Sequence, residues 1–298
     1  MIISIFTPHG GCPERCNFCD QKVSGGEPIS AASIVETIEA HLSSSKSDDV
    51  ELAFYGGTFT AMPERVQLAY LDTVKPYLLS GKIKSIRLAT RPDAIDLNWL
   101  TRLRDEYSLN FVELGVQSFN PEVLKALGRS HSVQSVSEAV KTIKSLNLGV
   151  GLHLMIGCPH EDLNDDAASV ARVVELKVDT VRIHPLLVIE GTELAGRTDF
   201  TPITLENAVE RTAKMVSSLE QNGISIIRMG LQDNELLAAQ VIAGPYHPAF
   251  GELVRGRILL NQILNQVPAE KEISTFELHL GTKNAAKMKA QKNYQINE

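Results

Sequence analysis

The stretch IISIFTPHGGCPERCNFCDQ, residues 2–21, is the most informative part of the chain, because a short apolar strand leads directly into a cysteine-rich loop. Cys12, Cys16 and Cys19 stand there in a C-x3-C-x2-C spacing. Thiolates are soft ligands that favour iron–sulfur clusters, zinc or copper(I). Three protein ligands on a cubane cluster leave one iron open, and an open metal position indicates chemistry at the metal rather than simple electron storage.

Other uses of these cysteines fit less well. Four cysteines in 298 residues are too few for the disulfide framework of a small secreted domain. A zinc site would need a fourth ligand, such as Cys158 or His160, and the triplet is not a usual zinc pairing. The spacing also differs from those of ferredoxins. An iron–sulfur cluster is therefore favoured, and zinc stays the alternative.

Composition narrows the class of protein. Hydrophobic residues make up 43% and charged residues 22%, as in a soluble globular protein with a sizeable core. The start of the chain has no signal-peptide pattern, and no apolar run is long enough to span a membrane. We therefore expect a cytoplasmic protein without a membrane partner. The net charge of −7 offers no broad basic surface, so we expect no DNA partner.

Strand-like and helical patterns alternate along most of the chain, which predicts an α/β fold around a parallel sheet. Six βα units are expected, fewer than the eight of a closed TIM barrel, so the fold class is a partial (β/α)6 TIM-like barrel with a small C-terminal extension. The predicted strands are 2–6, 49–57, 83–93, 109–118, 149–159 and 179–188.

Two domains are expected. Residues 1–222 form the barrel, and residues 223–298 form an extension that begins with the short strand 223–230 and ends in a polar, flexible tail. The tail carries several lysines after Thr282, which indicate either a solvated terminus or an RNA-binding arm.

The cysteine loop resembles the signature of the radical S-adenosylmethionine (SAM) enzymes, as does the Tyr55-Gly56-Gly57 turn at a strand end. The resemblance implies a [4Fe–4S] cluster held by the three cysteines, with SAM chelated on the fourth iron. It implies reductive cleavage of SAM to a 5′-deoxyadenosyl radical, which abstracts hydrogen from a substrate. It also implies a low-potential electron donor, such as a flavodoxin- or ferredoxin-like protein.

Residues at the carboxyl ends of the strands become candidate SAM contacts, because ligands of parallel α/β folds bind there. In the family, the glycine-rich turn binds the amino group of SAM, and the strand ending in Gly157 packs on its adenine. Thr58 stands where the family often has Glu. The candidate contacts are Tyr55, Gly56, Gly57, Thr90, Arg91, Glu113, Gln117, Ile156, Gly157 and Arg182.

Seven segments resemble, in order, the radical SAM part of the elongator catalytic subunit family: FTPHGGCPERCNFCDQ, FYGGTFT, ATRPD, VELGVQS, RSH, HLMIGCP and RIHPLLVIEGTEL. That family implies action on the wobble uridine of tRNA. The acetyltransferase domain of the full family is not expected in this chain, so the substrate is left open. Alternatives are a tetrapyrrole, for which coproporphyrinogen oxidases are the comparison, another small metabolite, or a non-enzymatic iron–sulfur or zinc protein that binds RNA. The roles of Cys158, His131 and His184 are also left open.

Overall fold

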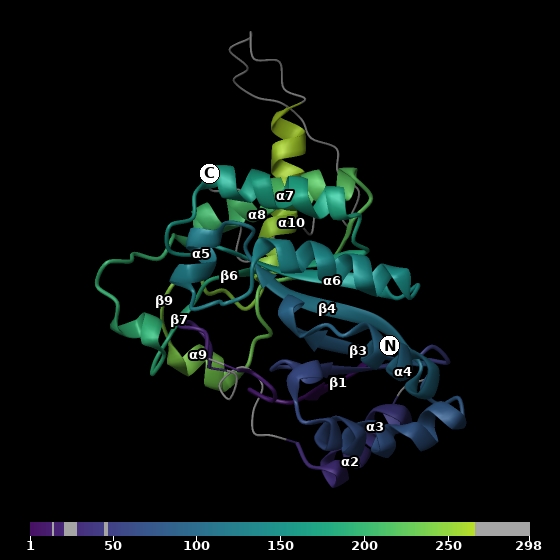
Figure 1. The fold of residues 1–298 in the computed structure, drawn as a ribbon. Coiled ribbons are helices and arrows are strands. Elements are labelled where there is room, and N and C mark those ends of the chain that lie inside the picture. Colours follow the sequence, from purple (N-terminus) through teal and green to yellow (C-terminus); the bar gives the residue numbers. More distant parts are fainter. Residues whose placement is uncertain (14, 21–28, 45–46, 266–298) are drawn as a thin grey trace, which may run out of the picture.

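The computed structural model describes residues 1–13, 15–20, 29–44 and 47–265. Its main element is a parallel sheet of seven strands in the order β1-β2-β3-β4-β5-β6-β8. The strands are β1 (Ile2–Phe6), β2 (Glu51–Tyr55), β3 (Ser85–Thr90), β4 (Leu109–Gln117), β5 (Gly149–Ile156), β6 (Thr180–Pro185) and β8 (Ser225–Met229). The sheet curls into a half-barrel, which confirms the predicted fold class (Figure 1).

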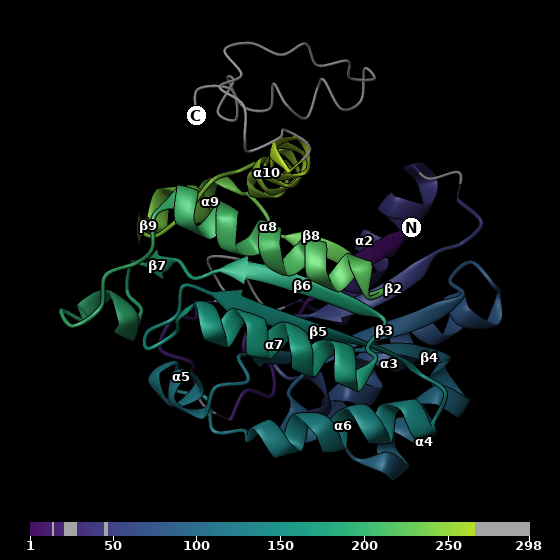
Figure 2. The same cartoon turned by 90° about the horizontal axis from the view of Figure 1, so that it is seen from above.

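The longer helices follow the strands and cover the outer face of the curved sheet, whereas the short α5 (Pro121–Ala126) and α9 (Glu235–Gln240) lie at its carboxyl end (Figure 2). The longer helices are α2 (Ala31–Ser44), α3 (Glu64–Leu79), α4 (Leu97–Tyr107), α6 (Val133–Ser145), α7 (Leu163–Leu176), α8 (Leu205–Gln221) and α10 (Phe250–Leu264). None of the described helices is both long enough and apolar enough to cross a membrane.

Strand alternation divides the sheet into two chemically different faces. The outer face carries fully buried apolar side chains that pack under the helices, among them Ile3, Ile5, Leu52, Phe54, Leu88, Leu114, Leu152 and Ile183. The inner face carries polar side chains instead, including Glu113, His153 and Arg182. The main hydrophobic core therefore lies between the sheet and its helices, and the inner face is left for a site.

The strand predicted at 223–230 belongs to the main sheet, where β8 pairs in parallel with β6. Behind it, α10 packs against α8, and Arg255 of α10 forms an ion pair with Glu220 of α8 at 2.8 Å. The domain boundary at residue 222 stays a prediction. The predicted polar tail lies outside the described residues, which end at 265.

A small antiparallel pair, β7 (Val188–Ile189) with β9 (Val241–Ala243), lies at the end of the half-barrel where the strands finish. Both ribbon views place it there together with α5 and α9, opposite the N-terminus of the chain (Figures 1 and 2). Leu187 and Ile189 of this region are buried against Leu237 of α9. The segment that holds α9 and β9 therefore closes the carboxyl ends of the strands on this side, although it follows the main strands in the sequence.

Candidate functional site

One cavity of about 580 Å³ runs along the inner face at the carboxyl ends of the strands. The cysteine loop lines one end of it, and residues of β6, β8 and the loop after β8 line the other. Its size is in the range of sites that enclose small molecules and cofactors. Among the predicted site residues, those that line it are Cys12, Cys16, Cys19, Tyr55, Gly56, Gly57, Thr90, Arg91, Gln117 and Arg182.

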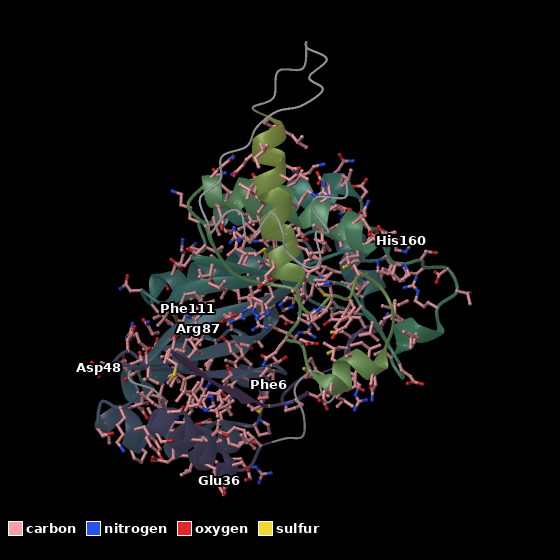
Figure 3. All side chains as sticks on the ribbon, turned by 180° about the vertical axis from the view of Figure 1, so that it is seen from behind. Phe6, Glu36, Asp48, Arg87, Phe111 and His160 are labelled. Atoms are coloured by element: carbon pink, nitrogen blue, oxygen red, sulfur yellow. The ribbon has the colours of Figure 1, made fainter. Side chains whose placement is uncertain are left out.

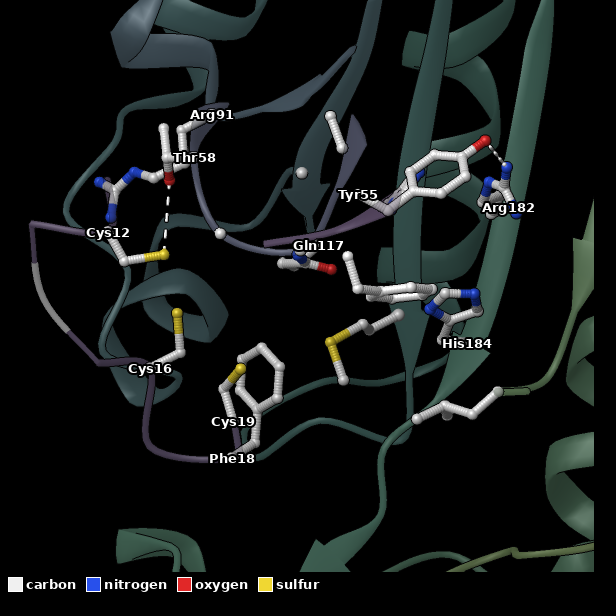
Figure 4. Close-up of a pocket in the computed structure, with 18 of the residues that line it drawn as sticks. Cys12, Cys16, Phe18, Cys19, Tyr55, Thr58, Arg91, Gln117, Arg182 and His184 are labelled. Carbon is white, nitrogen blue, oxygen red and sulfur yellow. Dashed lines mark hydrogen bonds between the residues drawn. The ribbon is translucent and has the colours of Figure 1, made fainter. Parts of the chain in front are cut away.

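The three thiols come from a loop held by its own backbone. Cys12 N–H donates to His9 O at 3.2 Å, and Cys19 N–H donates to Cys16 O at 3.0 Å. Side chains from distant elements also reach the sulfurs. Thr58 Oγ1 lies 3.5 Å from the Cys12 sulfur (Figure 4). Arg129 donates to the Cys16 sulfur at 3.5 Å.

Glycines lock this loop against the turn that follows β2. Thr58 N–H donates to Gly10 O at 2.7 Å. A Cβ on Gly57 would lie 2.2 Å from Gly10 O, and one on Gly11 would lie 2.2 Å from Thr58 O. Gly57 also has a φ of 64°, in the left-handed region that favours glycine. The Gly-Gly turn therefore positions the cysteines, a role that is separate from its predicted contact with SAM.

The donor set fits an iron–sulfur cluster. All three cysteines are half-buried thiols that line one cavity and form no disulfide with a described residue, and Phe18 lines the same end. Burial raises the pKa of the Cys12 thiol, against the hydrogen bond with Thr58, so a bound cation would favour the thiolate. The fit is one of donor chemistry: in the described part of the chain no three His, Cys, Asp or Glu side chains, these cysteines included, are grouped so as to hold a metal ion. Cluster ligation by these cysteines therefore stays a prediction.

Glu113 is the centre of a buried network on the inner face. Its side chain is 0% exposed, and it accepts hydrogen bonds from Arg87 at 3.0 Å and from Arg182 at 2.5 Å. His153 Nε2 lies 2.5 Å from the same carboxylate, and Tyr55 donates to it at 2.9 Å. Burial alone would raise the pKa of Glu113, but His153 and Arg182 hold it well below its usual range. The group is therefore an ionised carboxylate with both oxygens engaged.

The arginines of this network are themselves fixed. Arg182 also donates to the Tyr55 hydroxyl at 2.7 Å (Figure 4). Arg87 bonds Glu51 at 3.0 Å, and its guanidinium lies over the Phe111 ring, 3.8 Å from the centroid (Figure 3). The predicted contacts of Glu113 and Arg182 with SAM stay predictions, since the structure pairs these two residues with each other.

At the end of β3, Arg91 bonds both carboxylate oxygens of Asp93, at 2.9 and 2.7 Å, and Thr90 bonds Thr60 at 2.6 Å. At the end of β4, Gln117 has a φ of 71°, which is unusual for a residue with a side chain. Strained backbone of this kind concentrates at functional sites. Gln117 points into the cavity between the cysteine loop and the arginine network (Figure 4).

The structure does not bring Ile156 and Gly157 to the cavity. Ile156 is fully buried in the main core on the outer face, because strand alternation turns it away from the inner face. Its neighbour Met155 lines the cavity instead. The two predicted adenine contacts therefore lie beside the cavity rather than on it.

The residues with open roles lie in three different places. Cys158 is buried in a second apolar cluster with Met155, and burial raises the pKa of its thiol, as expected for an inert core cysteine. His131 is buried, which lowers its pKa to about 4. His184 lines the cavity, and burial lowers its pKa to about 3.

Sequence reasoning missed several residues that line the cavity, among them Phe6, Arg87, Arg129, His153, Met155 and Arg228. Strand alternation could have found some of them. Arg87 lies two residues before Ala89 on β3, and His153 lies two before Met155 on β5, so each shares its neighbour's inward face. Arg129 follows α5 in a loop, and no pattern in the sequence indicated its contact with Cys16.

Family models match almost the whole described chain. A model of the radical SAM superfamily matches residues 6–172, and a model of the radical SAM C-terminal domain matches residues 178–259. The first match covers more than half of the chain, and this chain therefore belongs to the radical SAM superfamily. It is a radical SAM enzyme, and the family implies SAM and an iron–sulfur cluster as its cofactors.

Two curated relatives have different lengths and names. A tRNA uridine(34) acetyltransferase of Methanocaldococcus infernus is 26% identical over 302 residues, which cover 85% of this chain and 55% of that protein. Protein YhcC of Escherichia coli K12 is 26% identical over 202 residues, which cover 63% of this chain and 65% of that protein. The chain thus spans about half to two thirds of the length of these relatives.

Among solved structures, the archaeal Elp3 of Methanocaldococcus infernus, with residues 1–46 deleted, has the same fold. The TM-score is 0.70 at 24% sequence identity, over 88% of this chain and 63% of that one. The shared fold supports the half-barrel architecture and leaves the substrate to other evidence.

Proposed function

We propose that this enzyme holds a [4Fe–4S] cluster through Cys12, Cys16 and Cys19 and uses it to cleave SAM reductively. The observation that carries the proposal is the single cavity that joins these thiols to polar residues at the carboxyl ends of the other strands. When bound, such a cluster supplies an electron to SAM and gives a 5′-deoxyadenosyl radical that abstracts hydrogen from substrate.

The chain's own residues would orient and shield SAM. Backbone at Gly56 and Gly57 is proposed to take its amino group, and Thr90, Arg91 and Gln117 to take its ribose and carboxylate. The adenine is proposed to lie at the end of β5 beside Ile156 and Gly157, where the Met155 side chain lines the cavity. The low exposure of Glu113 and its partners supports a site that excludes water from a reactive radical.

The test uses anaerobically purified protein with reconstituted cluster, SAM and dithionite. The expected result is formation of 5′-deoxyadenosine, with iron and sulfide in about equal amounts, as a cubane requires. Zinc in place of iron would favour the non-enzymatic zinc alternative. Bound cluster without any 5′-deoxyadenosine would contradict the proposed activity.

For the substrate, we propose modification of tRNA, with a tetrapyrrole or another small metabolite as the alternative. Similarity to a tRNA uridine(34) acetyltransferase supports the tRNA proposal. Comparative profiling of tRNA nucleosides and metabolites, in cells with and without the protein, tests both. Loss of a modified uridine would support tRNA, and an accumulating small molecule with unchanged nucleosides would support the alternative.

The remaining partners follow from the chemistry. The reaction needs one electron at low potential, so we propose a flavodoxin- or ferredoxin-like protein as donor. We also propose a cytoplasmic location, because reducing conditions there keep thiolates available to iron. Replacing dithionite with reduced flavodoxin in the 5′-deoxyadenosine assay tests the donor, and support of turnover by flavodoxin is the expected result.

A further inference from the structure

The end of the cavity farthest from the cysteine loop carries a second set of polar groups. His184 of β6 and Arg228 of β8 both line it. Arg228 stands opposite Arg182 in the register of these two strands, and His184 lies two residues beyond Arg182 on the same face. Figure 4 shows His184 close to Arg182, across the cavity from Cys12 and Cys16.

The cations around the cavity differ in how they are balanced. Arg182 is paired with Glu113 at 2.5 Å, and Arg91 is paired with Asp93 at 2.7 Å. Arg228 makes neither a hydrogen bond nor an ion pair with the residues that the structure describes. Burial and the charge of Arg182 lower the pKa of Arg228, while Tyr55 and Glu113 act to raise it. A guanidinium without a direct counter-ion among the described residues therefore stands at this wall of the cavity.

A second polar group beside Arg228 is also unsatisfied. His184 Nε2 is buried and has no hydrogen-bond partner among the described residues. Burial, together with the charges of Arg182 and Arg228 and the ring of His153, keeps the imidazole neutral near pH 7. A neutral ring in the Nε2–H tautomer is a hydrogen-bond donor, and a buried donor without an acceptor is costly.

We propose that Arg228 and His184 form a subsite that binds an anionic group of the substrate, a carboxylate or a phosphate. An anion would pair with Arg228 through charge-assisted hydrogen bonds and would accept a hydrogen bond from Nε2–H of His184. Leu187, Ile189 and Leu231 also line the cavity and would pack against the hydrocarbon next to the charged group. The inference deepens the proposed function and rests on it, because it places substrate opposite the cysteines.

The experiment measures binding of small anions to the SAM-loaded holoenzyme by isothermal titration calorimetry. The probes are succinate, inorganic phosphate and uridine 5′-monophosphate, and their neutral counterparts are succinamide and uridine. SAM is saturating, so its own carboxylate is not the anion that is measured. The wild-type protein is expected to bind a charged probe and not its neutral counterpart, and the preferred probe separates a carboxylate from a phosphate.

The variants are Arg228→Gln and Arg228→Lys, with Arg255→Gln as matched control on the outer surface. Arg228→Gln is expected to weaken binding of the charged probe roughly tenfold or more, since it removes a charge-assisted pair. Arg228→Lys should retain part of the affinity, and Arg255→Gln should bind like the wild type. Circular dichroism and thermal unfolding of each variant check that the fold is intact.

Three results would overturn the subsite. The first is wild-type protein that binds no charged probe better than its neutral counterpart. The second is equal affinity of Arg228→Gln and wild type. The third is a parallel loss of SAM affinity in Arg228→Gln, which would assign the two groups to SAM. The proposed function is judged separately, from 5′-deoxyadenosine formed by the wild type in the same preparation.

Discussion

The two ends of the cavity are built on different principles. At the cysteine end, backbone lies directly against backbone, as in the bond from Thr58 N–H to Gly10 O. At the other end, long charged side chains reach from separate strands to one carboxylate, that of Glu113. The first arrangement needs small residues at fixed positions in the sequence. The second needs side chains that share a face of the sheet.

Substitutions at the two ends of the cavity should therefore destabilise the protein for different reasons. A close backbone approach fails when any Cβ is added, whatever its chemistry. A buried charge network fails when one partner loses its charge, because the remaining charges are left in a poorly solvated place. Substitutions at the two ends should therefore affect metal loading and stability differently.

Loss of a cysteine from the loop should have the largest effect. Cys12→Ser, Cys16→Ser and Cys19→Ser are each expected to lose nearly all iron and sulfide and to form no 5′-deoxyadenosine, because a cubane held by two thiolates is not stably bound. Cys158→Ala is the matched control, since that cysteine is buried in an apolar cluster and does not itself line the cavity. It should keep its iron. Iron retained in Cys12→Ser would break the assignment of that thiol.

Glu113→Gln should be the most destabilising change in the network. It leaves Arg87 and Arg182 without their shared carboxylate, at an expected cost of about 3–5 kcal/mol in urea unfolding. The control is Glu220→Gln, which breaks a partly exposed pair with Arg255 and should cost under about 1 kcal/mol. Equal effects of the two variants would contradict the buried network.

The pH dependence of the same pair of proteins sharpens this test. The pKa of Glu113 is lowered by folding, so its contribution is complete above the unfolded pKa of about 4.3 and is lost as the pH falls below it. The difference in unfolding free energy between wild type and Glu113→Gln should therefore be constant from pH 7 to 5 and shrink below about pH 4. A difference that grows on acidification would contradict the assignment.

Gly57→Ala should lower both stability and iron content, because it blocks the backbone approach at the cysteine end. The added Cβ would meet Gly10 O at 2.2 Å, so the cysteine loop must move. We expect a loss of about 2–4 kcal/mol in unfolding free energy and a clear drop in iron content. Gly191→Ala is the control, because Gly191 also has a left-handed φ of 79° but nothing within 4 Å of its Cβ position. It should cost about 1–2 kcal/mol and leave iron content unchanged.

The smallest effect is expected at the strained end of β4. Gln117→Gly relieves a left-handed backbone and should change the unfolding free energy by no more than about 1 kcal/mol, while weakening SAM binding several-fold. Asn147→Gly relieves the same kind of strain, at a φ of 57°, outside the cavity lining. It should leave SAM affinity as in the wild type. Equal SAM affinity in both variants would remove Gln117 from the site.

The sequence predicted the cysteine end better than the arginine end, for a physical reason. Cysteines and glycines at short spacings act through local backbone geometry, which a motif records directly. The alternation of strand-like and helical patterns along the chain is also a local signal, and it predicted the half-barrel. Glu113 was predicted only as a candidate SAM contact, and the structure pairs it with Arg87 and Arg182.

Sequence patterns could not predict which side chains form hydrogen bonds across the sheet. Arg182 is 69 residues from Glu113, and nothing local distinguishes it from Arg228, which has no such partner among the described residues. The contact of Arg129 with Cys16 spans 113 residues. Ile156 and Met155 are neighbours on one strand, yet only Met155 faces the cavity. The sequence did not show which of the two side chains points inward.

Electron paramagnetic resonance of the reduced, reconstituted protein, recorded with and without SAM, tests the central claim most directly. A [4Fe–4S] cluster on Cys12, Cys16 and Cys19 keeps one iron open, so SAM should change the signal of the wild type and leave no cluster signal to change in Cys16→Ser. A wild-type signal that is identical with and without saturating SAM would contradict the open coordination position on which the proposed function rests.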